Sequence, residues 1–212
     1  MEEFDIIDTA IPTLGPSKIP SPVKPPLDNS RCNSFVADTD RVALDVDIDK
    51  TKQLIEAGID PPAFELAGPR EKIYFDPSKL KCAMVTCGGL CPGLNDIIRS
   101  IVLQLYYGYG VRNIFGIRYG LQGFIPKYGH DVIALNPEVV ANILDTGGSI
   151  LGSSRGPQSV DEILDSLERM NIGILFMIGG DGTLRAASAL ADAIKERSLK
   201  ISVIGIPKTI DN

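Results

Sequence analysis

The sequence has no apolar run of the roughly 20 residues that a membrane-spanning helix needs, and its acidic start does not resemble a signal peptide. It also has no excess of basic residues. The 21 Lys and Arg face 27 Asp and Glu, a net charge of −6, which argues against non-specific binding to nucleic acid. Only four cysteines are present, without a disulfide framework, which is typical of reduced cytoplasmic proteins. We therefore expect a cytoplasmic protein with neither a membrane nor a nucleic acid as partner.

Two common nucleotide-binding motifs are absent as well. The sequence has no Gly-x-x-x-x-Gly-Lys-Ser/Thr, so it is not a P-loop enzyme. It has no Gly-x-Gly-x-x-Gly, which counts against a dinucleotide-dependent dehydrogenase. Cys87 and Cys91 could contribute to a zinc site, but no second pair of Cys or His follows them. The only histidine, His130, falls in an expected loop, where a histidine is more often incidental than catalytic.

From about residue 81 onwards, expected strands alternate with expected helices. The strands are 82–86, 113–118, 172–178 and 201–206; the helices are 94–105, 137–144, one that begins at the capping box of Ser159 and Glu162, and 184–197. Such alternation predicts an α/β fold with a doubly wound, mostly parallel sheet covered by helices on both faces.

The N-terminal third of the chain differs from this pattern. Six prolines within residues 12–26 exclude a helix or a central strand there, which predicts an extended, partly disordered arm. Residues 41–48 alternate in part, as a half-buried strand does, and residues 50–57 predict a short helix. We therefore predict an N-terminal extension, residues 1–70, and an α/β domain, residues 71–212.

The segment that follows residue 178 is a glycine-rich turn, Gly-Gly-Asp-Gly-Thr at 179–183, placed between a strand and a helix. A corner of this kind exposes backbone N–H groups and a helix N-terminus, which suit a phosphate. Asp181 would repel that phosphate unless a metal ion lies between them. Two interpretations stay open from this pattern: a site for a phosphorylated ligand with magnesium, or a tight turn with an exposed Asp.

Three polar or glycine-rich segments each follow an expected strand: 87–93, 179–183 and 207–212. Ligand sites of open α/β sheets lie beyond the carboxyl ends of the strands, so we expect the three segments at one edge. The loop at 147–156 adds a guanidinium, that of Arg155, and the last segment adds a second carboxylate. Together these groups suit phosphoryl transfer, which depends on positioning and charge neutralisation.

Four ordered motifs resemble those of the 6-phosphofructokinase family. They are Cys-Gly-Gly-Leu-Cys-Pro-Gly-Leu-Asn at 87–95, Gly-Gly-Ser-Ile-Leu-Gly-Ser-Ser-Arg-Gly at 147–156, Gly-Gly-Asp-Gly-Thr at 179–183 and Pro-Lys-Thr-Ile-Asp-Asn at 207–212. The resemblance begins at about Phe64. The long extension makes the chain most similar to the branch found in trypanosomatids, plants and some bacteria. Compact bacterial members usually carry Asp where this chain has Leu90.

The resemblance implies a role for each matching residue. Nucleotide contacts would come from Gly89, Arg155, Gly156, Gly180, Asp181, Gly182 and Thr183, with Asp181 holding Mg²⁺. Sugar-phosphate contacts would come from Thr209, Ile210 and Asp211, with Asp211 as the base that takes the proton of the 1-hydroxyl of fructose 6-phosphate. From its position alone, Asp211 could instead cap a helix. The resemblance also implies ATP as donor, a place in glycolysis, a homotetramer and allosteric control.

The phosphoryl donor depends on two positions. Pyrophosphate-dependent relatives typically carry Asp where this chain has Gly182, and Lys where it has Lys208. Gly182 leaves room for the α-phosphate of ATP, and ATP-dependent members of the branch share the lysine, so we expect ATP. The alternatives are a pyrophosphate-dependent enzyme, a nucleotide-binding module without catalysis, and a lipid or NAD kinase, which shares only the Gly-Gly-Asp-Gly turn. Because the family pattern continues into a second domain, we expect little kinase activity from these 212 residues alone.

Overall fold

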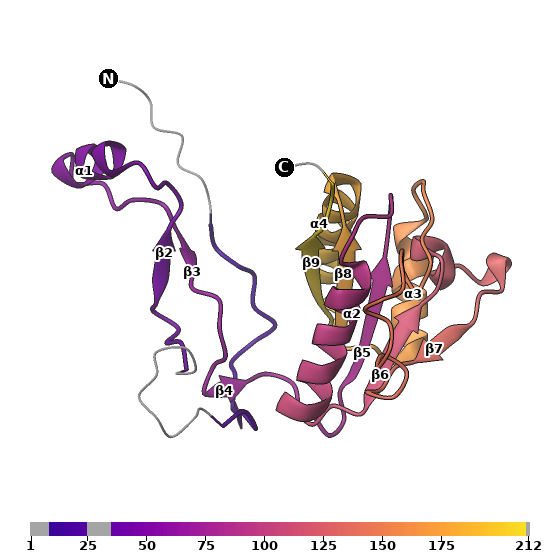
Figure 1. Ribbon diagram of the computed structural model, residues 1–212. Helices are drawn as coiled ribbons and strands as arrows, with labels where there is room; N and C mark the ends of the chain where they lie inside the picture. The colour runs from indigo at the N-terminus through magenta and orange to yellow at the C-terminus, as the bar shows by residue number, and fades with distance from the viewer. Residues whose placement is uncertain (1–8, 25–34, 211–212) are drawn as a thin grey trace. The chain divides into compact units, whose positions relative to one another are not determined.

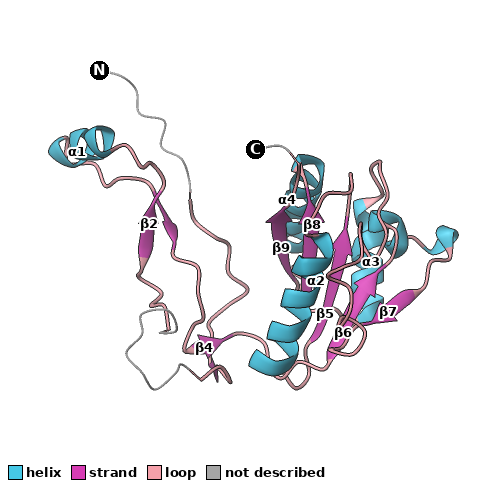
Figure 2. Cartoon of the chain, viewed as in Figure 1, coloured by secondary structure: helices cyan, strands magenta, loops and turns pink. Residues whose placement is uncertain are grey.

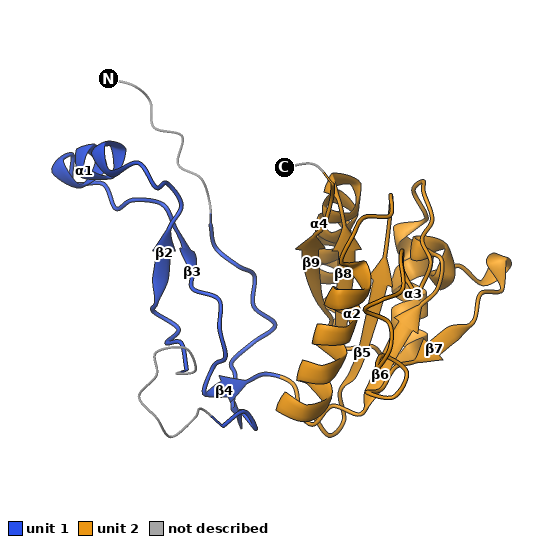
Figure 3. Ribbon diagram, in the orientation of Figure 1, with its two compact units in different colours: residues 1–74 blue, residues 75–212 orange. Residues whose placement is uncertain are grey.

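The computed structural model describes residues 9–24 and 35–210, and the chain divides into two compact units, residues 1–74 and residues 75–212 (Figure 3). The boundary expected from the sequence lies after residue 70. None of the described helices has both the length and the apolar character needed to cross a membrane.

The first unit is built from short elements (Figure 1). Strand β1 (Ile19–Pro20) pairs with β4 (Lys72–Ile73), β2 (Arg41–Ala43) pairs with β3 (Ala63–Glu65), both antiparallel, and α1 spans Ile48–Glu56. Leu54 is the only buried side chain among the described residues of this unit. The helix expected over residues 50–57 is confirmed, with its start two residues earlier.

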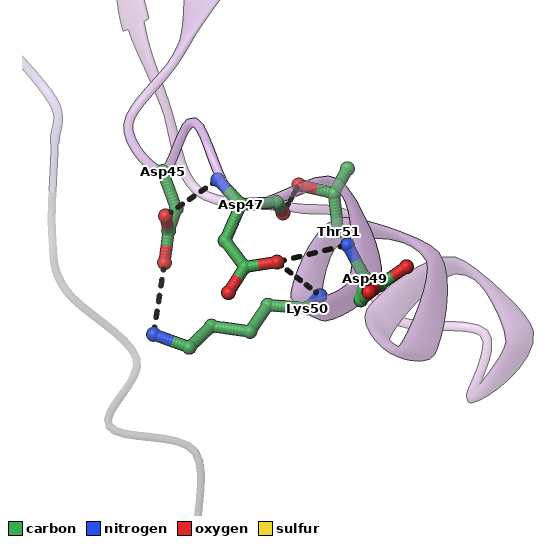
Figure 4. A network of polar contacts seen from close by, with 5 residues as sticks. All are labelled: Asp45, Asp47, Asp49, Lys50 and Thr51. Atoms are coloured by element: carbon green, nitrogen blue, oxygen red, sulfur yellow. Dashed lines mark hydrogen bonds and ion pairs between the residues drawn. The ribbon is translucent and has the colours of Figure 1, made fainter.

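The half-buried strand expected over residues 41–48 is confirmed as strand only at residues 41–43 and is wrong for residues 44–48. Only β2 is strand, and all three of its residues are exposed. The reason is a pair of aspartates that satisfy backbone N–H groups locally (Figure 4). Asp47 caps α1 by accepting from the N–H groups of Asp49 at 2.9 Å and Lys50 at 3.3 Å, and Asp45 accepts from the N–H of Asp47 at 2.9 Å. These bonds start a helix where the alternation predicts a strand.

The second unit contains a five-stranded sheet in the order β7-β6-β5-β8-β9 (Figure 2). Its strands are β5 (Lys81–Thr86), β6 (Asn113–Ile117), β7 (Val132–Ala134), β8 (Ile174–Gly179) and β9 (Ser202–Pro207). All neighbours are parallel except β7, which runs antiparallel to β6 at one edge. The mostly parallel sheet predicted from the sequence is therefore confirmed.

Helices cover both faces of this sheet. They are α2 (Leu94–Leu103, continued by a π-helical turn over Gln104–Gly108), α3 (Val160–Met170) and α4 (Asp181–Glu196), with the 3₁₀ helices η3 (Gly120–Phe124) and η4 (Pro126–Tyr128) between β6 and β7. Along β5, Ala83 and Val85 pack with α3 and α4, whereas Cys82 and Met84 pack with α2. Both sets are fully buried, as expected for a central parallel strand.

The predicted helix over residues 137–144 is wrong, because the segment forms only isolated turns. Asn136 caps the first turn by accepting from the N–H of Val139 at 2.9 Å, and the N–H of Val140 donates to its carbonyl oxygen at 3.2 Å. Two adjacent β-branched residues and Asn142 have low helix propensity, and a helix this short needs strong propensity or packing to propagate. The buried Val140 and Ile143 pack in the core with α2 without requiring a helix.

Candidate functional site

The order of the strands creates a crevice at the carboxyl ends of β5 and β8. From β5 the chain passes through α2 to β6 on one side, and it then crosses back through α3 to β8 on the other side. From the end of β8 the chain continues through α4 to β9, away from β6, and α2 and α4 cover opposite faces. The connections therefore leave the two neighbouring strand ends in opposite directions. Ligands of open α/β sheets bind at such a switch point.

The register of the strands brings the predicted segments to this edge. Thr86, the last residue of β5, lies opposite Ile178, and Gly179, the last residue of β8, lies opposite Pro207 at the end of β9. The described parts of the three segments that follow these strands therefore share one edge of the sheet, as predicted.

A cavity of about 660 Å³ opens at the crevice. Its volume lies in the range of ~300–1,000 Å³ that is typical of small-molecule sites. All residues predicted to contact nucleotide line it: Gly89, Arg155, Gly156, Gly180, Asp181, Gly182 and Thr183. Residues of three of the four motifs, which are far apart along the chain, are thus brought together in one place.

The corner between β8 and α4 is tightly packed on its inner side. A Cβ atom on Gly179 would overlap the hydroxyl of Thr183 and lie 2.6 Å from the carbonyl oxygen of Cys87, so only glycine fits. Thr183 is 5% exposed and directs its side chain into this packing. The close approach holds the first turn of the 16-residue α4 against the end of β5.

The outer side of the same corner is open. A Cβ atom on Gly180 or Gly182 would meet no other atom within 4 Å, so bare backbone borders the cavity at both positions. Gly180 precedes α4 without a side chain to cap it, and the N-terminus of the helix therefore presents its partial positive charge to the cavity. This arrangement suits a phosphate group.

The loop that carries Arg155 is anchored to the end of β5. The Thr86 hydroxyl donates to the carbonyl oxygen of Gly152 at 2.6 Å, and the Ser153 hydroxyl donates to that of Gly88 at 2.6 Å. In return, the N–H of Gly88 donates to the carbonyl oxygen of Ser154 at 3.1 Å. Thr86 is only 1% exposed, so its bond is shielded from water, and the three bonds together anchor the loop that places Arg155 in the lining of the cavity.

The cavity has three charged side chains in its lining: Arg155, Asp181 and Arg185. Sequence reasoning missed Arg185. It lies one helical turn after Asp181 on α4, and i, i+4 positions share a helix face, so this spacing could have identified it. Two cations and one anion favour an anionic ligand.

Asp181 is the only carboxylate in the lining, and no group of three metal-ligating side chains occurs in the described part of the chain. These residues fit Mg²⁺ bound together with a phosphorylated ligand, because magnesium is commonly held by one or two carboxylates plus phosphate oxygens and water. Cys87 does not suit a zinc site, because burial raises the pKa of its thiol to about 12 and keeps it protonated at neutral pH.

Two of the three residues predicted to contact the sugar phosphate are described, and neither is brought into this cavity. Thr209 and Ile210 follow β9 at the same sheet edge, but they do not line it, and the Ile210 side chain is 78% exposed. Asp211 lies outside the described residues, so its role as a base stays a prediction. Lys208 donates its backbone N–H to the carbonyl oxygen of Gly179 at 2.9 Å, which ties β9 to the corner.

A family model described as Phosphofructokinase matches residues 81–212. This chain belongs to the phosphofructokinase family. The match covers the whole parallel sheet and all four motifs of this phosphofructokinase chain.

Curated relatives of this phosphofructokinase chain carry the same family name. The ATP-dependent 6-phosphofructokinase of Borreliella burgdorferi is 58% identical over 148 residues, which are 70% of this chain and 33% of that protein. The enzyme of the same name from Amycolatopsis methanolica is 45% identical over 206 residues, which are 97% of this chain and 45% of that protein. The ATP-dependent 6-phosphofructokinase of Trypanosoma cruzi is 47% identical over 158 residues, which are 74% of this chain and 33% of that protein. The chain thus spans less than half the length of these relatives.

Solved structures share the fold. A pyrophosphate-dependent phosphofructokinase from Marinobacter aquaeolei superposes with a TM-score of 0.56 at 20% identity, covering 63% of this chain and 34% of that one. The Pichia pastoris phosphofructokinase in the T-state superposes with a TM-score of 0.55 at 24% identity. The match covers 78% of this chain and 21% of that one. At these identities the likeness concerns the fold alone.

Proposed function

We propose that this chain forms the nucleotide-binding part of an ATP-dependent 6-phosphofructokinase. The observation that carries the proposal is the cavity at the switch point, where Arg155, Asp181 and the bare backbone of Gly180 and Gly182 meet. The names of the curated relatives support it. The chain would bind Mg-ATP there, and fructose 6-phosphate would be the acceptor.

In this reaction the 1-hydroxyl oxygen of fructose 6-phosphate attacks the γ-phosphorus of ATP. The bond between that phosphorus and the β–γ bridging oxygen breaks, so fructose 1,6-bisphosphate forms and ADP leaves. Asp211 would take the proton of the attacking hydroxyl. The guanidinium of Arg155 and the N-terminus of α4 would offset charge on the phosphates, and Mg²⁺ held through Asp181 would supply further neutralisation.

The open space at Gly182 favours ATP over pyrophosphate as the donor. A carboxylate introduced at this position has room to extend into the cavity, because Gly182 lines the cavity and no protein atom lies within 4 Å of the Cβ site. It would then occupy and repel the region that the α-phosphate of ATP needs, whereas pyrophosphate has no further group to place there. Pyrophosphate as donor is the alternative, and the name of one fold neighbour shows that this fold also supports it.

Isothermal titration calorimetry of the chain with Mg-ATP and with magnesium pyrophosphate tests the donor. We expect Gly182→Asp to abolish Mg-ATP binding and to leave pyrophosphate binding measurable. Asp181→Asn should weaken Mg-ATP binding by at least about tenfold, because it removes a charged metal ligand. Asp192→Asn is the matched control, since it removes a carboxylate that is exposed on α4 and does not line the cavity. Unchanged Mg-ATP affinity in Gly182→Asp would overturn the assignment of ATP.

We expect catalysis to need a protein as long as the relatives, because the family resemblance implies a second domain with most of the sugar-phosphate contacts. In such a protein, Asp211→Asn should lower kcat by about 10²-fold or more and change ATP binding little. The 212 residues alone should bind nucleotide without appreciable turnover in a coupled assay for fructose 1,6-bisphosphate. Robust turnover by this chain would contradict the expectation that a second domain is needed. The homotetramer stays a proposal from the family resemblance, and the cytoplasmic location stays a proposal from the use of cysteine.

A further inference from the structure

A second cavity, of about 630 Å³, lies at the other end of helix α3. The first cavity borders α3 at Val160 and Ile163, near its start, whereas the second borders it at Ser166, Arg169 and Met170, near its end. The remaining walls come from β5, β6, β7 and the 3₁₀ helices η3 and η4. The two cavities share no lining residue.

The lining of this second cavity is basic. It contains Lys81, His130 and Arg169 and no Asp or Glu. The ammonium of Lys81 donates to the carbonyl oxygen of Met170 at 3.4 Å, and the guanidinium of Arg169 donates to the hydroxyl of Ser166 at 2.8 Å. Both acceptors are uncharged. Within the described residues, no carboxylate lies within 4.0 Å of Lys81 or Arg169, so neither positive charge is neutralised by an ion pair.

Three of the four carboxylates of α3 are engaged elsewhere. Asp161, Asp165 and Glu168 all pair with Arg197, which follows α4, and the pair with Asp165 is 2.9 Å long. They therefore leave the basic groups at the end of α3 uncompensated. The C-terminus of the helix itself adds only about half a negative charge, against two full positive charges from Lys81 and Arg169. The net field in the cavity thus favours an anion.

Apolar side chains form the floor of the cavity. Phe124 and Ile125 are 1% and 2% exposed, and Phe115 and Pro126 add further apolar surface. The imidazole of His130 is held beside two aromatic rings, 4.5 Å from the ring centre of Tyr119 and stacked 6.0 Å from that of Tyr128. The contacts limit the movement of the imidazole, which is the third group able to donate to an anion.

We propose that this basic cavity is a second ligand site, which binds a phosphate monoester with an apolar or aromatic body. The phosphate would be held by Lys81, Arg169 and His130. The apolar floor of the cavity, at Phe115 and Pro126, would contact the body of the ligand. The proposal does not depend on the function of the first cavity, because no lining residue is common to both.

Phenyl phosphate is a suitable probe, because it combines a phosphate monoester with an aromatic ring. In a titration of the ¹⁵N-labelled chain followed by NMR, we expect saturable shifts of the amides of Gly123, Gly129 and His130. Inorganic phosphate should bind the same amides more weakly, and phenol at equal concentration should leave them unshifted. Shifts confined to Gly89, Gly180 and Gly182 would mean that the probe binds only the first cavity, and that result would overturn the proposal.

Charge-neutral variants decide whether the basic groups hold the ligand. Arg169→Gln should weaken phenyl phosphate binding by at least about fivefold, because a charge-assisted hydrogen bond is lost. Lys81→Gln gives a second, independent variant if the first disturbs the end of α3. Lys195→Gln is the matched control, since it removes one positive charge from an exposed position of α4 outside the cavity. Equal weakening by the control, or none by either variant, would overturn the proposal.

Discussion

The two units of the chain bury their side chains to very different extents. The second unit has two hydrophobic cores, one on each face of the five-stranded sheet, whereas the described part of the first unit buries only Leu54. In the first unit, Val46 is 93% exposed, Ile48 68% and Ile55 61%. Two-stranded pairs without such a core are marginally stable by themselves. The precise placement that a phosphate site needs is therefore available only in the second unit, where every motif residue of the first cavity lies.

Leucine truncations in the two units test this difference most strongly. Leu164 is fully buried in the core of α3 and α4, so Leu164→Ala should lower the free energy of unfolding of the second unit by about 3–5 kcal/mol. Leu54→Ala should leave the main unfolding transition unchanged, because the core of the second unit does not contain it. Urea denaturation followed by circular dichroism measures both. A main transition shifted equally by the two variants would show that the units unfold as one.

Two glycine variants sharpen the comparison at the level of the backbone. Gly179→Ala should destabilise the second unit by about 1–3 kcal/mol, because the new Cβ atom would overlap the side chain of Thr183 and the carbonyl oxygen of Cys87. Gly58 in the first unit has a φ of +73° but open space around its Cβ site, so Gly58→Ala strains only the local turn. The midpoint of thermal unfolding of the second unit should fall for the first variant alone.

Two buried thiols should make the free energy of unfolding of the second unit decrease at alkaline pH. Burial raises the pKa of Cys82 and of Cys87 to about 12 from a value of 9.0. Above pH 9 the unfolded chain loses these protons and the folded chain keeps them, so the free energy of unfolding should fall as pH rises from 9 towards 12. Each thiol should contribute about 1 kcal/mol of this loss by pH 10. Urea denaturation at pH 8 and pH 10 measures it, and Cys82→Ala should remove its share; an unchanged slope would contradict the assignment.

The smallest effect is expected from the ion pairs of Arg197. Its pKa is raised, first by the side-chain hydrogen bond to Asp165 and then by that to Asp161, but all these groups are on the surface. Arg197→Gln should therefore lower the thermal midpoint only slightly at low salt, and not at all in 1 M NaCl. A salt-independent loss would indicate packing by the arginine stem instead.

Much of the second unit could be predicted from local patterns. The strands at 82–86, 113–118 and 201–206 and the N-cap at Ser159 are all present, because apolar runs and capping residues act over a few positions. The helix after the glycine-rich turn begins at Asp181, three residues earlier than expected, so the turn is part of the first helical turn. The failures at 41–48 and 137–144 have different causes. The side-chain cap at Asp47 starts a helix where the alternation predicts a strand, whereas low helix propensity and short length leave 137–144 in turns.

The sequence by itself determined the alternation of strands and helices and the four motifs, since both depend on residue type and spacing. Only the tertiary structure decided which side chains share a cavity, because that depends on strand order and on the faces that α2 and α3 cover. In the first cavity it placed Arg185 beside the predicted Arg155 and Asp181, and it left Thr209 and Ile210 outside. In the second cavity it brought together three basic residues from distant parts of the chain, Lys81, His130 and Arg169. Such pairings carry no local signal, since residues far apart in sequence meet only when the sheet has formed.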